Sequence, residues 1–256
     1  FTADGDSWLS RRRLMQPAFH RQRIASLGPV IVDCARVMLD RWAGRSELPV
    51  EQEMMTVTLQ VAGRALFSRD LLGESEQLGQ AFGTISEYVN YRFRTPFAPP
   101  LWWPGQQNRA LRAAMKVHDR VIYDLIRERR ALREQPGDLL GMLIDARDAD
   151  TGQGMTDDEL RREISVMMFA GHETTAVTLT WALYLLSQNP QARQRLEEEV
   201  DSVLAGREPA MEDLPKLAYT RRVIDETLRL YPPAWGVARQ SVEADTLGGF
   251  TLPAGS

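Results

Sequence analysis

Residues 156–190 read TDDELRREISVMMFAGHETTAVTLTWALYLLSQNP and form the strongest helical pattern in the chain. Thr156 and Glu159 form a capping box at its start, and Asn189-Pro190 is a stop signal at its end. About 33 residues at about 1.5 Å each make a helix about 50 Å long, enough to cross a whole domain. Residues 164–186 are apolar on every side, so the sequence predicts a central, buried helix.

A membrane span is the rival explanation for so apolar a helix. The interruption His172-Glu173-Thr174-Thr175 leaves no run of about 18 apolar residues, the length that a span needs. One central acid also costs about 2.5–3.5 kcal/mol on insertion scales. We therefore expect the core helix of a soluble protein and no membrane span.

An acid and an alcohol in the middle of an apolar helix need an explanation, because an unpaired buried carboxylate shifts its pKa or must find donors. Thr174 can bond back to the carbonyl of Ala170, which weakens the helix where Gly171 already does so. This favours a local groove or bulge, a feature that often marks a functional site. Local physics leaves two interpretations open: a functional site, or a satisfied Thr174 beside a Glu173 that snorkels or pairs with an arginine.

The rest of the chain predicts a mainly α fold. Residues 27–42 carry one apolar helical stripe, and residues 109–134 form a long arginine-rich helix. Residues 95–105 contain four prolines and cannot be regular helix, and residues 145–154 read as a polar surface loop. Near the end, residues 249–253 look like part of a β-hairpin, which adds a small β region at the C-terminus.

The composition excludes several classes of protein. The 31 Lys and Arg residues, of which 29 are Arg, are interleaved with 35 acidic residues and give a net charge of −4, so binding to nucleic acid has little support. The arginine bias is typical of a GC-rich, bacterial coding sequence. Cys34 is the sole cysteine, which excludes an internal disulfide and favours a reducing compartment. We expect a cytoplasmic protein, and no signal peptide is visible.

Two metal sites are excluded by residue spacing. A zincin pairs two histidines four residues apart, but the position four residues after His172 is Ala176. A di-iron carboxylate bundle needs Glu-x-x-His pairs, and none precedes His20, His118 or His172. The sequence therefore predicts no metal site that the chain builds from its own side chains.

Two Glu-x-x-Arg spacings occur, at Glu159/Arg162 and Glu226/Arg229. Each places opposite charges one helical turn apart, where they can pair. With 18 Glu and 29 Arg in 256 positions, roughly two such spacings arise by chance. The spacing alone is therefore no evidence of a functional pair. Only the surrounding sequence can separate them.

The surroundings of the second spacing are specific. Glu226-Thr-Leu-Arg-Leu-Tyr-Pro-Pro233, followed by Arg239 and the turn of residues 248–255, resembles the K-helix region of cytochrome P-450 monooxygenases. Residues 170–175, AGHETT, then resemble the I-helix oxygen-activation motif of that family, at the expected distance upstream. Near the start, residues 4–19 with Trp8-x-x-x-Arg12 and Pro17-Ala18-Phe19 resemble its C-helix. Three motifs in the right order extend the resemblance over the whole chain.

The resemblance implies a cytochrome P-450 fold, mainly α with a small β region near the C-terminus and truncated at both ends. Residues 1–256 would be a single partial domain, from the C-helix through the K-helix to the start of the following β hairpins. The chain starts at Phe1 without an initiator Met and stops directly after an apolar segment, so we expect both ends to be cut. The implied cofactor is heme b.

Each site residue takes its expected role from the matching motif. Trp8 and Arg12 would hydrogen-bond one heme propionate, and Arg239 would bind the second, because a guanidinium is always charged and bidentate. Ala170 and Gly171 would lie against the heme face and leave room for dioxygen. The remaining four residues form two pairs. They are Glu173 and Thr174, expected to deliver protons, and Glu226 and Arg229, expected to anchor the fold around the heme.

The axial thiolate is the decisive departure from the family pattern. The family supplies it from a Phe-x-x-Gly-x-x-x-Cys-x-Gly loop downstream of the K-helix. Cys34 does not match, because its neighbours Asp33 and Ala35 are not that loop's glycines and it lies upstream of the I-helix. We expect a small, buried core residue at Cys34, and a chain that is inactive alone.

The function implied is a heme monooxygenase that inserts one atom of dioxygen into a small apolar substrate. Its reductant would come from a ferredoxin or flavoprotein reductase, separate or fused. Residues 71–98, around Tyr88, Tyr91 and Phe93, are candidates for the pocket, and whether they line it stays open. Two alternatives remain: a non-catalytic helical binding or scaffold protein, and a peroxide-using or isomerising member of the family. The intact acid–alcohol pair argues against both.

Overall fold

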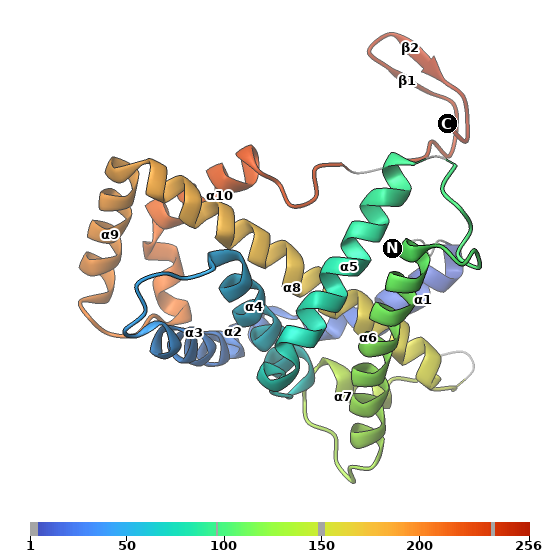
Figure 1. The fold of residues 1–256 in the computed structure, drawn as a ribbon, viewed down its shortest axis with the longest axis horizontal. Helices are drawn as coiled ribbons and strands as arrows, with labels where there is room; N and C mark the ends of the chain where they lie inside the picture. Colours follow the sequence, from blue (N-terminus) through green and yellow to red (C-terminus); the bar gives the residue numbers. More distant parts are fainter. Residues whose placement is uncertain (1–4, 96, 148–151, 237–238) are drawn as a thin grey trace.

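The computed structural model describes residues 5–95, 97–147, 152–236 and 239–256. Helices make up most of the structure, and one small hairpin lies near the C-terminus (Figure 1), so the predicted fold class is confirmed. The helices are α1 (Gly5–Met15), α2 (Arg21–Ser26), α3 (Gly28–Trp42), α4 (Val50–Phe67), α5 (Ser75–Arg94), α6 (Gln106–Arg130), α7 (Leu139–Asp145), α8 (Asp157–Gln188), α9 (Pro190–Leu204) and α10 (Ala218–Leu230). The short elements are the 3₁₀ helices η1 (Gln16–Phe19), η2 (Leu72–Glu74) and η3 (Met211–Lys216) and the strands β1 (Asp245–Leu247) and β2 (Phe250–Leu252).

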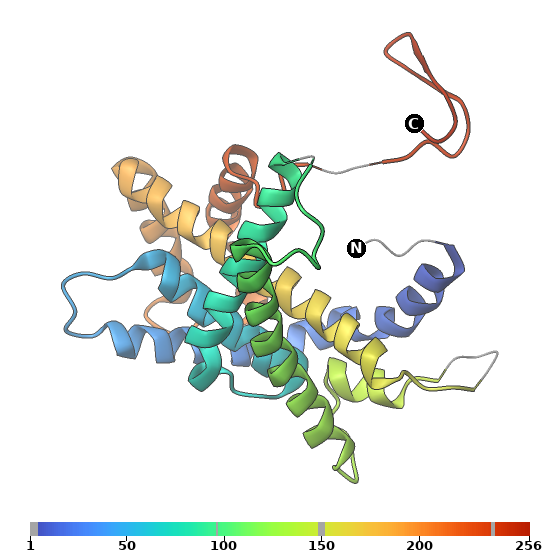
Figure 2. The same ribbon diagram turned by 45° about the vertical axis from the view of Figure 1, so that its right-hand side comes forward.

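Helix α8 crosses the helical body (Figures 1 and 2), and α4, α6, α7, α9 and α10 pack against it. Its predicted capping box is present: the backbone N–H of Thr156 donates to Glu159 Oε2 at 2.9 Å, and the backbone N–H of Glu159 donates to Thr156 Oγ1 at 3.3 Å. The helix ends at Gln188, directly before Asn189-Pro190, as predicted. Among the helices that the structure describes, none is long and apolar enough to cross a membrane.

One side of α8 is buried and another is accessible. The buried stripe follows the four-residue spacing of a helix face and consists of Ile164, Met168, His172 and Ala176. Elsewhere on the helix Gly171 is exposed, and Leu183 and Tyr184 are 42% and 51% exposed. The prediction of burial on every side is therefore wrong at these positions, because apolar composition does not say which side of a helix its neighbours cover.

Two apolar clusters hold the helices together. The larger cluster joins α4, α5, α6, α7 and α8 around fully buried side chains such as Phe67, Ile122 and Leu140. Burial of each such side chain contributes about 1.5–3 kcal/mol. The smaller cluster joins α3, α4 and α8 around Cys34, which has no exposed surface and packs with Met54. The prediction that Cys34 is a buried core residue is confirmed.

The proline-rich segment before α6 is non-helical in its described residues, as predicted, and α6 begins at Gln106 instead of Arg109. Asn108, which is 4% exposed, organises this connection. Its Nδ2 donates to the carbonyls of Pro100 at 2.8 Å and Trp103 at 3.0 Å, while the hydroxyl of Tyr88 donates to its Oδ1 at 2.8 Å. One amide therefore fastens α5 and the connection to the start of α6.

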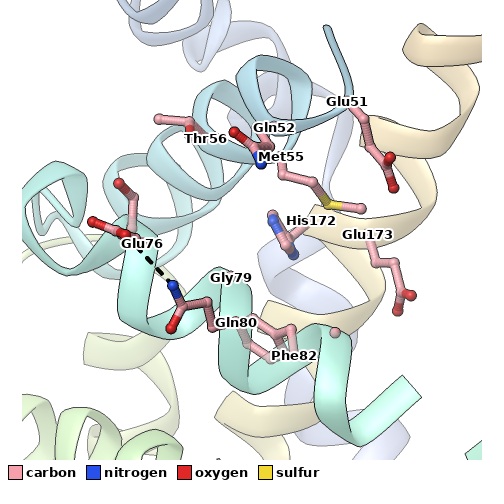
Figure 3. Close-up of a pocket in the computed structure, with 12 residues that line it drawn as sticks. Glu51, Gln52, Met55, Thr56, Glu76, Gly79, Gln80, Phe82, His172 and Glu173 are labelled. Carbon is pink, nitrogen blue, oxygen red and sulfur yellow. Dashed lines mark hydrogen bonds between the residues drawn. The ribbon is translucent and has the colours of Figure 1, made fainter. Parts of the chain in front are cut away.

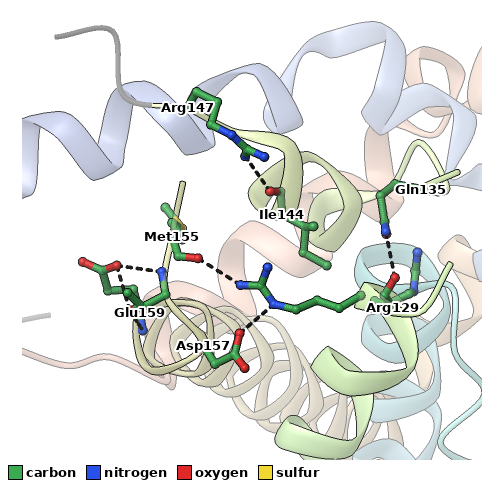
Figure 4. A network of polar contacts seen from close by, with 9 residues as sticks. Arg129, Gln135, Ile144, Arg147, Met155, Asp157 and Glu159 are labelled. Carbon is green, nitrogen blue, oxygen red and sulfur yellow. Dashed lines mark hydrogen bonds and ion pairs between the residues drawn. The ribbon is translucent and has the colours of Figure 1, made fainter. Parts of the chain in front are cut away.

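A buried ion pair between Arg129 and Asp138 joins the end of α6 to the start of α7, with side chains only 6% and 5% exposed. Arg129 Nη2 also donates to the carbonyl of Phe67 at 2.6 Å, and Gln135 Nε2 donates to the carbonyl of Arg129 at 2.7 Å (Figure 4). Asp138 in addition caps α7, since its Oδ1 accepts the backbone N–H of Gly141 at 2.8 Å. The Arg129–Asp138 pair thus joins three helices, because Phe67, whose carbonyl Arg129 binds, ends α4.

Strands β1 and β2 pair antiparallel, with Asp245 opposite Leu252 and Leu247 opposite Phe250. The two residues between them, Gly248 and Gly249, have φ angles of +58° and +86°. Positive φ at both positions is what a two-residue hairpin turn requires, and glycine adopts it without strain. The predicted hairpin at the C-terminus is confirmed.

Candidate active site

Helix α8 presents its smallest residues on an accessible side. Gly171 is exposed, and a Cβ added to it would contact only Leu66 Cδ1, at 4.0 Å. Ala170 and Thr174 are half-buried and lie one turn apart on the face opposite His172, since 100° of rotation per residue separates them from it by about 200°. A planar group could approach the backbone closely along this side.

Thr174 Oγ1 donates to the carbonyl of Ala170 at 2.6 Å, as the sequence predicts. Of the groove or bulge that the sequence favours here, the bulge is wrong: α8 keeps α-helical hydrogen bonding without interruption from Asp157 to Gln188. A carbonyl oxygen has two lone pairs, so it can accept the hydroxyl in addition to its regular helical partner. The helix therefore accommodates Thr174 without a break.

Glu173 is half-buried and is held by one neutral partner. Ser86 Oγ on α5 donates to Glu173 Oε1 at 2.8 Å. Burial raises the pKa of Glu173, and the hydrogen bond from Ser86 opposes that rise. The structural interpretation in which Glu173 pairs with an arginine is not what the described contacts show. Sequence reasoning missed Ser86, because no local pattern joins two residues that lie 87 positions apart.

Replacement Ser86→Ala should raise the pKa of Glu173 further. The alcohol stabilises the carboxylate, so its removal leaves burial unopposed and shifts ionisation to higher pH. A pH titration of the carboxyl resonance of ¹³C-labelled glutamate, assigned by comparison with Glu173→Gln, would measure the shift. A pKa that is unchanged or lower in Ser86→Ala would contradict the bond seen here. Thr84→Ala, two residues earlier on α5, is the matched control, since Thr84 bonds only to the carbonyl of Gln80 among the described contacts.

Trp8 and Arg12 lie together on α1. The guanidinium carbon of Arg12 is 5.4 Å from the centre of the Trp8 ring, and both side chains are exposed. An indole N–H beside a guanidinium is the donor set that suits a carboxylate. The structure brings these two predicted residues together.

Arg239 is exposed and lies at the start of the C-terminal hairpin region. Two residues later, the hydroxyl of Ser241 donates to the carbonyl of Pro253 at 2.7 Å, which closes this region on itself. The role of Arg239 at a propionate stays a prediction.

Glu226 and Arg229 form a bidentate pair on α10, with both nitrogen–oxygen distances at 2.7 Å. Arg229 lowers the pKa of Glu226, and both side chains are more than half exposed. Their anchoring role stays a prediction. The sequence did not predict a neighbouring contact, in which the rings of Trp181 on α8 and Tyr231 after α10 stack 3.9 Å apart and 4° from parallel.

Cys34 cannot act as a thiolate ligand in this structure. It is fully buried on α3, and burial raises the pKa of its thiol. Its sulfur lies 3.6 Å from Arg64 Nη1, within the smaller core cluster. Across the residues that the structure describes, no group of three or more His, Cys, Asp or Glu side chains could hold a metal ion.

A cavity of about 460 Å³ lies between α4, α5 and α8 (Figure 3). Its inner wall includes His172, Glu173 and Phe82. The cavity therefore reaches Glu173 from the side of α8 that carries His172, which faces away from Thr174. Of the aromatic residues proposed for a substrate pocket, Tyr88 is buried against Asn108 and Phe93 is 83% exposed, and neither lines this cavity.

Comparisons with known proteins give one answer. The family described as cytochrome P-450 matches residues 1–256. The chain is 35% identical over 253 residues to cyclooctat-9-en-7-ol 5-monooxygenase of Streptomyces melanosporofaciens, covering 98% of this chain and 55% of that protein. It is also 35% identical over 249 residues to pentalenene oxygenase of Streptomyces avermitilis, covering 96% of this chain and 55% of that protein.

Among solved structures, the retinoic-acid-bound cyanobacterial CYP120A1 resembles the chain with a TM-score of 0.83 and 27% identity. The match covers 99% of this chain and 56% of that one. The chain therefore spans about half the length of the relatives it matches.

Proposed function

The chain belongs to the cytochrome P-450 family, and we propose that it is part of a heme monooxygenase that inserts one atom of dioxygen into an apolar organic substrate. A ferredoxin or a flavoprotein reductase, separate or fused, supplies the reducing equivalents. One observation carries the proposal. Glu173, the acid of the acid–alcohol pair, is half-buried with a neutral partner, so its pKa is raised and it can hold a proton.

The residues present fit a heme. Trp8 and Arg12 offer an indole N–H and a guanidinium to a propionate, and Arg239 is the proposed donor to the other propionate. Ala170 and the exposed Gly171 give a flat, small surface for the macrocycle. Bound there, heme supplies the activation of dioxygen and the oxidation of the substrate.

Glu173 and Thr174 deliver protons at that surface. The Thr174 hydroxyl bonds to the carbonyl of Ala170, and a change of its side-chain rotamer re-aims it away from the helix backbone. The Glu173 carboxylate takes up a proton and then donates it. The transfer leaves Glu173 ionised again. Glu226 and Arg229 take no part in the chemistry and stabilise the fold near the heme.

The axial thiolate comes from outside this chain. Cys34 is buried in a core cluster as a neutral thiol, so it does not fit the role. Without a thiolate ligand the heme would not be held in its active form, and residues 1–256 alone are inactive.

The substrate is an unsaturated cyclic hydrocarbon or an alcohol derived from one. Support comes from two relatives whose names give cyclooctat-9-en-7-ol and pentalenene as the compounds oxidised. Both names denote apolar molecules with at most one hydroxyl group.

Turnover under ¹⁸O₂ tests the proposal. A holoenzyme that contains this chain, supplied with NADPH, a ferredoxin and its reductase, should convert pentalenene or cyclooctat-9-en-7-ol into a product with one ¹⁸O atom by mass spectrometry. Label that came from water instead would contradict oxygen insertion. Turnover with hydrogen peroxide but not with dioxygen would identify a peroxide-using enzyme, and substrate binding without turnover by either route would favour a non-catalytic binding protein.

A further inference from the structure

A cavity of about 700 Å³ lies between α3 and the segment that joins α9 to α10. Small-molecule sites typically have volumes of about 300–1,000 Å³. One wall is the surface of α3 that carries Ile31 and Val32, and the other carries Met211 and Leu214. Helix geometry places Val32 about 200° around α3 from Cys34, so the cavity lies on the side of α3 that faces away from the smaller core cluster.

Large apolar side chains from both walls keep much of their surface exposed. Ile31 on α3 is 47% exposed, and Leu214 on η3 is 55% exposed. Met211, which is also on η3, is half-buried. Removal of such surface from water drives the binding of apolar groups, so the two walls favour a ligand with an apolar skeleton.

The wall opposite α3 is held in place by the buried carboxylate of Asp213, which is 2% exposed. Arg207 Nη1 and Nη2 donate to its two oxygens at 2.6 Å each, and the backbone N–H of Ala210 donates to Oδ2 at 3.0 Å. These donors hold the pKa of Asp213 well below its usual range. Gly28 on α3 gives Met211 room, since a Cβ added to Gly28 would lie 2.9 Å from Met211 Cγ. The cavity is therefore pre-formed between two fixed walls.

The charged side chains of the described lining are three carboxylates and one guanidinium: Asp33, Glu208, Glu212 and Arg36. Asp33 is already paired, because Arg36 forms an ion pair with it and Arg64 Nη1 donates to its Oδ2 at 2.5 Å. The pKa of Arg36 is raised mainly by Asp33 and less strongly by Glu208. Glu208 and Glu212, both exposed, thus give the cavity an excess of negative charge.

We propose that this cavity binds an amphipathic organic cation. The apolar skeleton of the ligand packs against Ile31, Met211 and Leu214, and its ammonium group lies beside Glu208 and Glu212. Charge complementarity selects this class of ligand. A neutral apolar compound would use only the walls, and a hydrated metal ion would use only the carboxylates. The site is separate from the chemistry proposed at Glu173, so its failure would leave the proposed function standing.

Titration of the holoenzyme with benzyltrimethylammonium tests the proposal. Its quaternary nitrogen has no lone pair, so the probe cannot ligate heme iron. With methionine labelled by ¹³C at the methyl group, the resonance of Met211, assigned by its loss in Met211→Leu, should shift saturably as the phenyl ring enters the cavity. Neopentylbenzene, in which carbon replaces the charged nitrogen, should bind at least about fivefold more weakly, because it forms no ion pair.

Removal of the two carboxylates separates charge recognition from apolar contact. The double variant Glu208→Gln with Glu212→Gln should bind benzyltrimethylammonium about fivefold more weakly than wild type and neopentylbenzene equally well. Both side chains are exposed, so the fold should be unaffected. The matched control is Glu47→Gln with Glu243→Gln, which removes the same charge from exposed positions that do not line the cavity.

Ile31→Ser tests the apolar wall and should weaken the binding of both probes. Leu39→Ser is its control, because Leu39 is an exposed apolar residue on the same helix but outside the lining.

Four results would overturn the proposal. The first is a Met211 resonance that does not respond to benzyltrimethylammonium. The second is equal affinity for the charged and the neutral probe, or for wild type and the Glu208/Glu212 variant, which would reduce the cavity to an apolar groove. The third is an equal response to calcium chloride, which would identify a metal site instead. The fourth is a crystal structure of the holoenzyme in which another part of the protein fills the space beside Met211.

Discussion

Replacement of Thr174 by alanine in a holoenzyme that contains this chain should divert most reducing equivalents into hydrogen peroxide. The hydroxyl is the alcohol nearest Glu173 along α8, and its loss interrupts the proton path at the heme surface. Product formed per NADPH should fall at least about tenfold, while NADPH oxidation continues. Parallel assays of product, NADPH and peroxide measure this directly.

Thr180→Ala is the control for this prediction. Its hydroxyl makes the same local bond, to the carbonyl of Ala176 at 2.9 Å, so the substitution removes an equivalent contact within α8. Uncoupling of similar size in Thr180→Ala would mean that the helix, and not the proton path, had been perturbed. Hydroxylation that stayed fully coupled in Thr174→Ala would remove Thr174 from the role.

Asp138→Asn should lower the free energy of unfolding by about 3–5 kcal/mol, because it leaves the charge of Arg129 buried without a counter-charge. Asparagine preserves the size of the side chain, and its oxygen can still accept the backbone N–H of Gly141. The loss therefore isolates the ion pair from the helix cap. A fall in Tm of roughly 10 °C by differential scanning calorimetry is expected.

Asp124→Asn on α6, the helix that carries Arg129, provides the comparison. Asp124 pairs with Arg127 at 2.9 Å, but the two side chains are 40% and 77% exposed, so the pair should contribute less than about 1 kcal/mol. Equal Tm values for Asp138→Asn and wild type would show that water reaches Arg129 and compensates its charge.

Interactions between near neighbours in the sequence could be predicted, and those between distant residues could not. The capping box of α8, its end at Asn189-Pro190 and the Thr174 back-bond all join residues within four positions. These contacts follow from helix geometry, which residue spacing specifies. The turn at Gly248-Gly249 is local in the same sense, since positive φ favours glycine.

The contacts that complete the candidate site depend on packing. Ser86 meets Glu173 only because α5 lies across α8, and the sequence offers many alcohols that could have done so. The exposed side of α8 could not be predicted for a related reason. An apolar side chain prefers an apolar environment, but the sequence does not say which neighbour provides it. The cavity beside His172 likewise exists only where three helices meet.

The Asn108 amide has a mechanical consequence for Glu173. Tyr88 is tied to Asn108, and Ser86 lies two residues before Tyr88 on the same rigid helix. A displacement of α6 is therefore transmitted along α5 to the Ser86 hydroxyl. A movement of about 1 Å would stretch its bond to Glu173 beyond the range in which hydrogen bonds form. The position of α6 thus bears on the one hydrogen bond that opposes the rise in the pKa of Glu173.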